Sequence, residues 1–407
     1  MNTRLLLRVL ALAGALLTAA PGARGDPVMD WNEVAFKAVV TARQSPPMGV
    51  RSMAVVHAAM FDAINAIQPR YRPFRYTGTP PAGASPDAAA AVAAHTALLK
   101  LFPEQRAAFD EALARTMATV PDAGARDGGA GLGKAVAESL LAWCAEDRVG
   151  APTAYRPVTR PGVYVMTTLP AGDDFGASRP WLLARGDQFR PPPPPALTSE
   201  TWARDYEETL TMGARTGSKR TPEHTQVAQF WVVTGAPAFN GIIRQSVAKR
   251  QLDTPAAARV MALTYMAFND ALVAVFDAKY AYNFWRPITA VRNGDQHGNM
   301  VIKREPGWLP LVDAPLHPEY PCAHCISSAT VVAVLQSQLG DEMPGLTMSS
   351  PTLPGVTRQW NRLSDLMQEV SNARIWSGVH YRNSAEVGTR MGQQVATHAV
   401  ANYLQPR

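Results

Sequence analysis

Apolar residues along most of this chain recur with the period of an α-helix, and small residues stand between them. Within residues 31–67, for example, Val55, Ala59 and Ala63 form one stripe that small neighbours would allow to pack closely. This pattern predicts a buried helix. Further helices are predicted over residues 86–102, 103–117, 133–144, 199–212, 222–233, 236–250, 254–285, 321–339, 360–375 and 384–404.

Three stretches lack this period. Residues 122–133 are rich in glycine and aspartate and predict a loop, and residues 149–196 are rich in proline, glycine and arginine. The second stretch closes with the prolines 191–195, which exclude α-helix and favour a stiff extended arm. Residues 293–320 form a third irregular excursion, whose length is typical of a functional segment. Because strand signals are almost absent, the predicted fold is all-α.

The first 25 residues have the pattern of a secretory signal peptide: two arginines, a short apolar run and a segment of small residues. We therefore expect a periplasmic or secreted protein. We divide the rest into an N-terminal helical region with an irregular arm, residues 26–190, and a C-terminal helical catalytic region, residues 191–407. No apolar run appears long enough for a membrane span, so we expect none.

The net charge is weak evidence for a nucleic-acid partner. Loss of the predicted signal peptide removes Arg4, Arg8 and Arg24 and lowers the formal charge from +6 to +3. No basic run is interleaved with aromatic residues, so we expect no nucleic-acid binding. Helix-rich surfaces of this kind often associate, which makes a homo-oligomer a further expectation.

Three short segments in the C-terminal half contain the residues best suited to anion binding and catalysis. The first contains Lys279 and Arg286, which would lie two turns apart on one face of the predicted helix. Two such charges can converge on a single anion. A solvated basic face would have the same pattern, so this pair alone does not establish a site.

The second segment places Pro321 immediately before a predicted helix. The amides of Cys322, Ala323 and His324 would then lie at a helix N-terminus, where unpaired N–H groups favour an oxyanion. His324 could exchange a proton with that oxyanion, although a histidine packed in a loop is the alternative.

The third segment runs from Arg374 to His380. A continuous helix would point these two side chains in different directions. Ser377 and Gly378 predict that the helix ends between them, which would let His380 fold back toward Arg374.

In this order, the three segments have the pattern Lys, six residues, Arg-Pro, then Pro-Cys-Ala-His, then Arg, five residues, His. The pattern resembles the vanadium-dependent haloperoxidases and the phosphatidic-acid-phosphatase-type acid phosphatases. Residues 30–32, 53–67, 219–221 and 229–231 also resemble the bacterial haloperoxidase-like branch. The resemblance covers nearly the whole mature chain and implies the helical bundle of that superfamily.

The resemblance also implies a role for each residue. The groups that would bind the equatorial oxygens of vanadate or phosphate are Lys279, Arg286, Arg374 and the amide of Ala323. His380 would be bonded to the metal of vanadate or would attack phosphate as a nucleophile, and His324 would be the general acid/base opposite it. His317 occupies the position of a second histidine in bromoperoxidase-like members, although an exposed loop histidine is the alternative.

Two residues depart from the family pattern. Cys322 stands where the motif has serine, and a thiol is a weaker hydrogen-bond donor than a hydroxyl, so we expect at most a supporting contact to the anion. Ala323 stands where the motif has glycine, and it keeps its amide in place only if its φ is negative.

The two cysteines of this segment also leave other interpretations open. Cys322 and Cys325 could form a disulfide, or could hold zinc together with His317 and His324. A thioredoxin-like motif would need a βαβ context that is missing. A haem attachment would need a histidine where Ile326 follows Cys325.

The anion decides the predicted activity. With vanadate the chain would oxidise halide with hydrogen peroxide, and with a phosphomonoester as substrate it would be an acid phosphatase that works through a phosphohistidine. The resemblance favours the haloperoxidase. A non-catalytic exported oxyanion-binding protein is the third possibility.

Overall fold

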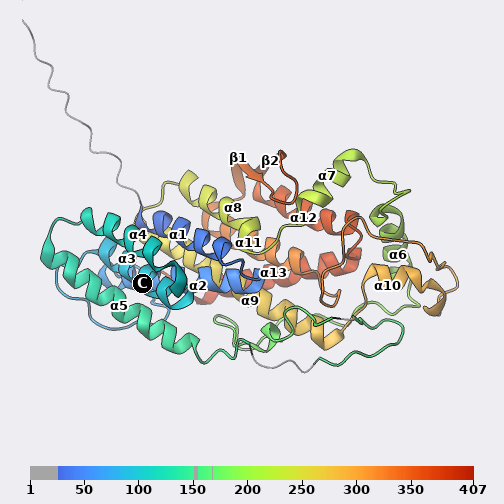
Figure 1. Cartoon of the computed structure of the whole chain (residues 1–407), viewed down its shortest axis with the longest axis horizontal. Helices are drawn as coiled ribbons and strands as arrows, with labels where there is room; N and C mark the ends of the chain where they lie inside the picture. Colours follow the sequence, from blue (N-terminus) through green and yellow to red (C-terminus); the bar gives the residue numbers. More distant parts are fainter. Residues whose placement is uncertain (1–25, 151–154, 167) are drawn as a thin grey trace, which may run out of the picture.

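A computed structural model describes residues 26–150, 155–166 and 168–407 (Figure 1). The predicted signal peptide lies outside these residues. Helices make up 59% of the structure and strands 5%, which confirms the all-α prediction. The helices of the N-terminal part are α1 (Pro27–Thr41), α2 (Pro46–Ile67), α3 (Pro86–Leu101), α4 (Arg106–Ala118) and α5 (Ala123–Cys144). Those that follow are α6 (Glu200–Gly213), α7 (Pro222–Phe230), α8 (Ala236–Lys249), α9 (Thr254–Tyr282), α10 (Pro287–Arg292), α11 (Ala323–Leu339), α12 (Leu363–Trp376) and α13 (Arg382–Asn402).

Two predictions for the N-terminal part are wrong. Residues 31–67 form two helices, because Arg43 adopts a positive φ of 49° and Pro46 starts a new helix. Residues 122–133, predicted as a loop, belong mostly to α5. Their glycines allow α5 to lie directly against α3, since a Cβ on Gly133 would come within 2.2 Å of the carbonyl oxygen of Ala89.

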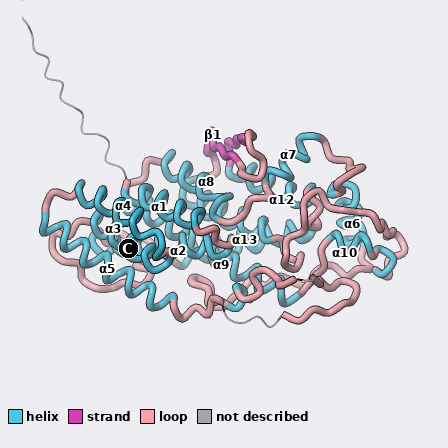
Figure 2. The backbone as a smooth tube through the Cα atoms, in the orientation of Figure 1, coloured by secondary structure: helices cyan, strands magenta, loops and turns pink. Residues whose placement is uncertain are grey.

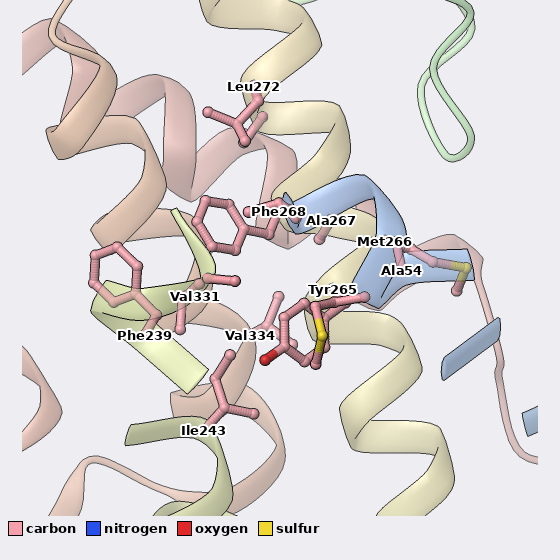
Figure 3. Packing of buried hydrophobic residues seen from close by; sticks show 14 of the residues in the cluster. Ala54, Phe239, Ile243, Tyr265, Met266, Ala267, Phe268, Leu272, Val331 and Val334 are labelled. Carbon is pink, nitrogen blue, oxygen red and sulfur yellow. The ribbon is translucent and has the colours of Figure 1, made fainter. Parts of the chain in front are cut away.

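Helix α9 runs through the middle of the molecule and is buried along most of its length. It packs against α2, α11 and α13 (Figures 1 and 2). Figure 3 shows how Phe239 of α8, Phe268 of α9 and Val331 of α11 meet in the core. This packing holds the ends of α9 and α11 in place, and both ends carry predicted site residues.

By length and composition alone, α2 and α9 are apolar enough to cross a membrane. The fold, however, covers 89% of the apolar window of α2 and 94% of that of α9. Such burial is typical of core helices.

A small antiparallel sheet follows α11, and it was not predicted. Strands β1 (Glu342–Ser349) and β2 (Thr357–Arg362) pair through partners such as Leu346 and Trp360. The predicted helix over 360–375 therefore begins only at Leu363 and ends at Trp376.

Two buried carboxylates fasten irregular segments onto the helical core. Asp62 of α2 accepts hydrogen bonds from the amides of residues 74, 75 and 76 at 2.8 to 3.0 Å. Asp270 of α9 accepts from the amides of residues 181, 182 and 183 at 2.6 to 3.0 Å. These hydrogen bonds therefore fix the positions of residues 74–76 and 181–183 against the helices.

Candidate active site

Lys279 and Arg286 approach each other differently from the prediction of one helix face. Helix α9 ends at Tyr282, and Asn283 then turns the chain with a left-handed φ of 48°. Arg286 is the N-cap of the next helix, α10, whose first residue is Pro287. The chain turn, and not helical periodicity, brings the two cations near each other.

His380 folds back toward Arg374, as the sequence predicts. Helix α12 ends at Trp376, and Gly378 has a φ of 77°. A Cβ on Gly378 would lie 2.5 Å from the carbonyl oxygen of Gly213, so only glycine fits this turn. Arg374 itself is fixed by a 2.8 Å hydrogen bond from Nη1 to the carbonyl oxygen of Trp231.

Arg286 connects several parts of the site. Its Nε donates to the carbonyl oxygen of His317 at 2.9 Å, and its Nη1 donates to that of Val379 at 2.8 Å. Nη1 also lies 3.3 Å from Nε2 of His380, and Nη2 lies 3.0 Å from Nδ1 of His317. One guanidinium thus fixes the positions of both histidine-bearing loops.

Glu319 is a central residue to which the sequence analysis gave no role. Its Oε1 lies 2.7 Å from Nδ1 of His380 and accepts a hydrogen bond from the amide of Tyr381 at 3.2 Å. Lys279 donates through Nζ to the carbonyl oxygens of Pro318 and Glu319, both at 2.8 Å. A carboxylate inside the segment from His317 to His324 was the available signal.

Helix α11 presents Ala323 and His324 in its first turn. Cys322 is the N-cap, and its Sγ accepts a hydrogen bond from the amide of Cys325 at 3.1 Å. Ala323 begins the helix and does not have a positive φ, so alanine in place of glycine causes no strain there. The first amides of a helix have no intrahelical acceptor, which leaves those of Ala323 and His324 suited to an anion.

Cys322 and Cys325 form a disulfide. Cys322 therefore has no thiol hydrogen to donate, and the weak donor considered from the sequence does not exist in this state. The zinc alternative is wrong as well, because both sulfurs are bonded to each other. No group of three or more histidine, cysteine or acidic side chains is arranged to hold a metal ion within the described residues.

A cavity of about 420 Å³ opens directly beside these residues. Its polar end is lined by His317, Ala323, His324 and Arg374. Nε2 of His324 and Nε of Arg374 are buried, and neither has a hydrogen-bond partner among the described residues. Buried polar atoms seldom remain unpaired in native proteins, so these two nitrogens point to a bound acceptor.

The electrostatics fit an anionic ligand. Lys279, Arg286 and Arg374 are all at least 98% buried, since their exposed fractions are 0%, 1% and 2%. Burial lowers the pKa of Arg286 to about 10 and that of Arg374 to about 9. It lowers the pKa of Lys279 well below its usual value, with a further contribution from Arg286. A bound oxyanion would compensate these charges, so the residues present fit vanadate or phosphate.

Burial lowers the pKa values of His317, His324 and His380 well below 6.5, and the nearby cations Lys279, Arg286 and Arg374 lower them further, which favours the neutral imidazoles. Burial also raises the pKa of Glu319 to about 7, against the opposing effect of Arg286 and Lys279. A neutral His380 whose Nδ1 hydrogen is held by Glu319 has its lone pair on Nε2, the atom needed for a ligand or a nucleophile.

The structure therefore brings the predicted residues together at one site, and part of this site lines the cavity. Lys279, Arg286, His317 and His380 are linked through hydrogen bonds that include Glu319, while Ala323, His324 and Arg374 line the cavity. His317 is half-buried and bound to Arg286, so it is not the exposed loop histidine of the alternative interpretation.

Known proteins share this architecture. The family model of the VCPO second helical-bundle domain matches residues 259–406. Vanadium chloroperoxidase of Curvularia inaequalis is 22% identical, over 52% of this chain and 45% of that protein. The match thus spans less than half the length of this relative.

Solved structures of bacterial proteins are similar over more of the chain. A bacterial vanadium-dependent iodoperoxidase has a TM-score of 0.79 and 21% identity, and the match covers 93% of this chain and 97% of the other. The holo form of a bacterial vanadium-dependent chloroperoxidase has a TM-score of 0.68 and 17% identity, with 87% and 91% covered. Residues 259–406 therefore form a helical-bundle domain of the VCPO type, and the chain is related in sequence and fold to the vanadium haloperoxidases.

Proposed function

We propose that this chain is an exported vanadate-dependent haloperoxidase that oxidises halide with hydrogen peroxide. The observation that carries the proposal is the cluster of three buried cations beside the unpartnered Nε2 of His324 and Nε of Arg374. The relatives named above are vanadium-dependent peroxidases, which supports vanadate as the anion. When bound, vanadate would supply the Lewis acidity that activates hydrogen peroxide toward halide.

The chain's own residues have separate tasks in this proposal. Lys279, Arg286 and Arg374 balance the negative charge of the anion, and the first-turn amide of Ala323 donates to one of its oxygens. Nε2 of His380 would hold the metal of vanadate, and Glu319 would keep the Nδ1 hydrogen in place. His324 accepts or donates a proton at Nε2 as hydrogen peroxide enters.

An acid phosphatase is the second candidate, because the pairing of His380 with Glu319 also suits a nucleophile that attacks phosphorus. A neutral imidazole backed by a carboxylate is an activated nucleophile. Nε2 of His380 would bond to phosphorus while the bond to the ester oxygen breaks. The leaving oxygen would take a proton from His324, and water would then release phosphate from His380.

Assays on a single preparation of the protein distinguish these functions. Purified chain, freed of bound anions, is assayed with vanadate and hydrogen peroxide against iodide, bromide and chloride, and without vanadate against p-nitrophenyl phosphate. We expect halide oxidation that depends on vanadate and is inhibited by phosphate. Phosphatase activity without any halide oxidation would establish the second candidate. Anion binding with neither activity would leave the non-catalytic oxyanion-binding protein.

Export is a separate part of the proposal. We expect cleavage near residue 25 and recovery of the mature chain outside the cytoplasm. Fractionation followed by N-terminal mass determination tests this, and a cytoplasmic chain that keeps residues 1–25 would contradict it.

A further inference from the structure

A small cavity lies beside Glu319, apart from the cavity that ends at His324 and Arg374. The two cavities share no lining residue. The walls of the small cavity come from the end of the proline run 191–195, α6, the turn after α9, the segment before α11 and the start of α13. Its volume is about 10 Å³. A buried water molecule needs roughly 10 to 15 Å³ of such space, so the cavity has the size of one water.

Three oxygen atoms at this cavity lack a hydrogen-bond partner among the described residues. They are Oε2 of Glu319, the hydroxyl oxygen of Tyr381 and Oγ of Ser384. The three residues are 0%, 2% and 1% exposed. Buried polar atoms of native proteins are almost always paired, so three unpaired oxygens around one cavity indicate a partner that they share.

The other buried polar side chains of the cavity already have partners. Asp205 accepts a hydrogen bond from the amide of Asn383 at 2.7 Å. The hydroxyl of Tyr320 donates to a backbone carbonyl oxygen at 2.8 Å, and Nε1 of Trp202 donates to a histidine nitrogen at 2.9 Å. The need for a further partner is therefore confined to the three unpaired oxygens.

Packing holds the two hydroxyl-bearing residues in place. Tyr381 is the N-cap of α13, and its ring packs edge to face on Trp202 at 4.8 Å and on Phe284 at 6.0 Å. Ser384 lies in the first turn of α13, and its carbonyl oxygen accepts a hydrogen bond from the amide of Cys322 at 3.2 Å. Neither hydroxyl forms a hydrogen bond with the carboxylate of Glu319. A bridging molecule pairs all three oxygens without moving these elements.

Charge favours a neutral molecule at this position. Burial raises the pKa of Glu319 to about 7, whereas the two nearby cations Arg286 and Lys279 lower it. The hydroxyl of Ser384 lowers this pKa too, as a nearby donor does. The carboxylate would repel an anion, and the two cations would repel a metal ion. Water can donate to the carboxylate oxygen and to one hydroxyl while it accepts from the other hydroxyl, so it satisfies all three oxygens.

We propose that one ordered water molecule bridges Oε2 of Glu319 to the hydroxyls of Tyr381 and Ser384, and that these two hydroxyls thereby position His380. With Oε1 bound to Nδ1 of His380 and Oε2 bound to the water, the carboxylate is held at both oxygens. Outer partners of this kind fix the ring orientation of a ligand histidine. The consequence for vanadate rests on the proposed function. The water itself does not, and it would serve a phosphohistidine in the same way.

A crystal structure that shows ordered solvent tests the water directly. In the chain freed of bound anions, we expect one peak of density within about 3.2 Å of all three oxygens. This result needs no activity, so it is independent of the proposed function. Absence of the peak would overturn the inference. A direct hydrogen bond from either hydroxyl to Glu319 in place of the water would overturn it as well.

Hydrogen exchange at His380 tests the positioning role. In a chain with isotope-labelled histidine, the Nδ1 hydrogen of His380 gives a magnetic resonance signal that His380→Ala removes. Tyr381→Phe and Ser384→Ala should each speed the exchange of this hydrogen with solvent roughly fivefold or more, because a loosely held Glu319 releases it more often. The ring hydrogen of the buried His57, outside the site, should exchange as before and shows that the fold is intact.

Tyr206→Phe is the matched control for these variants. Its ring also packs on Trp202, at 6.2 Å, but its hydroxyl donates to the carbonyl oxygen of Lys303 at 2.6 Å and does not line the small cavity. The control should leave the exchange at His380 unchanged. Equal exchange rates in the control and in the two cavity variants would overturn the positioning role.

Anion affinity separates this inference from the proposed function. Tyr381→Phe and Ser384→Ala should each weaken vanadate binding roughly threefold to tenfold, because a less firmly held His380 binds the metal more weakly. Sulfate, which is held by charge alone, should bind as before. Equal losses for both anions would overturn the positioning role. Faster exchange at His380 in a chain that binds no vanadate would refute the proposed function and keep the positioning role.

Discussion

Nδ1 of His380 lies 2.7 Å from Oε1 of Glu319, and both side chains are almost completely buried. Nη1 of Arg286, which can only donate, lies 3.3 Å from Nε2 of His380, so Nε2 carries the lone pair and Nδ1 carries the hydrogen that faces Glu319. Partners of this kind fix the orientation of a metal-binding histidine and raise its basicity. The pair therefore determines which nitrogen of His380 can react.

Glu319→Gln should lower vanadate affinity roughly 10- to 100-fold, because a neutral amide polarises His380 less than a carboxylate does. Sulfate, which is held by charge alone, should bind the variant as well as before or better, since one negative charge is removed. Calorimetric titration with both anions measures the difference. Asp341→Asn, which removes an ion pair with Arg362 outside the site, is the control. A parallel loss of sulfate and vanadate affinity in Glu319→Gln would indicate general damage to the fold.

His380→Ala should abolish halide oxidation and lower vanadate affinity by roughly 100-fold or more, because it removes the atom that bonds to the metal. Phosphate affinity should change less than about tenfold, since the three buried cations remain. His398→Ala is a matched control: His398 lies on α13 and contacts the carbonyl oxygen of Leu182 at 3.1 Å. Vanadate affinity equal to that of the unmodified chain would remove His380 from the site.

The disulfide determines how a contact between residue 322 and the anion can be tested. A single Cys322→Ser exchange would both break the disulfide and add a hydroxyl, so two double variants are needed. Cys322→Ser with Cys325→Ala should bind vanadate roughly tenfold more tightly than Cys322→Ala with Cys325→Ala. A hydrogen bond to a charged group contributes about 1.5 to 3 kcal/mol, and the two variants differ only in the hydroxyl. Equal affinities would show that residue 322 does not reach the anion.

The sequence predicts the helical fold and the approach of the motif residues well where local rules apply. Gly378 marks the end of α12 because only glycine fits that turn, and Pro287 marks the start of α10. Long-range packing decided the rest. The glycines of α5 predict a loop when the sequence is read alone, because their close contact with α3 involves residues far away in the chain. No sequence rule places Glu319 beside His380.

A buried histidine outside the site makes stability depend on pH. His57 contacts Asn32 at 2.8 Å and stacks on Tyr265, and burial lowers its pKa from 6.5 to about 3. Below pH 6.5 the unfolded chain binds a proton at His57 that the folded chain does not, so acid favours unfolding until about pH 3.

His57→Gln should remove this contribution. The free energy of unfolding of the unmodified chain, relative to that of the variant, should fall by roughly 1.4 kcal/mol per pH unit between pH 6 and pH 4. Denaturant unfolding of both chains across this range measures the slope. A constant difference would mean that His57 is protonated to the same extent in both states.

The residues around the anion and some walls of the cavity beside them belong to different parts of the chain. Lys279, Arg286, Glu319, His324, Arg374 and His380 all lie between residues 259 and 406, the range of the VCPO-type domain. The walls at 45–48 and 171–175 lie outside that range. Substitutions in these two short segments can therefore change the shape of the cavity while every residue around the anion position stays the same.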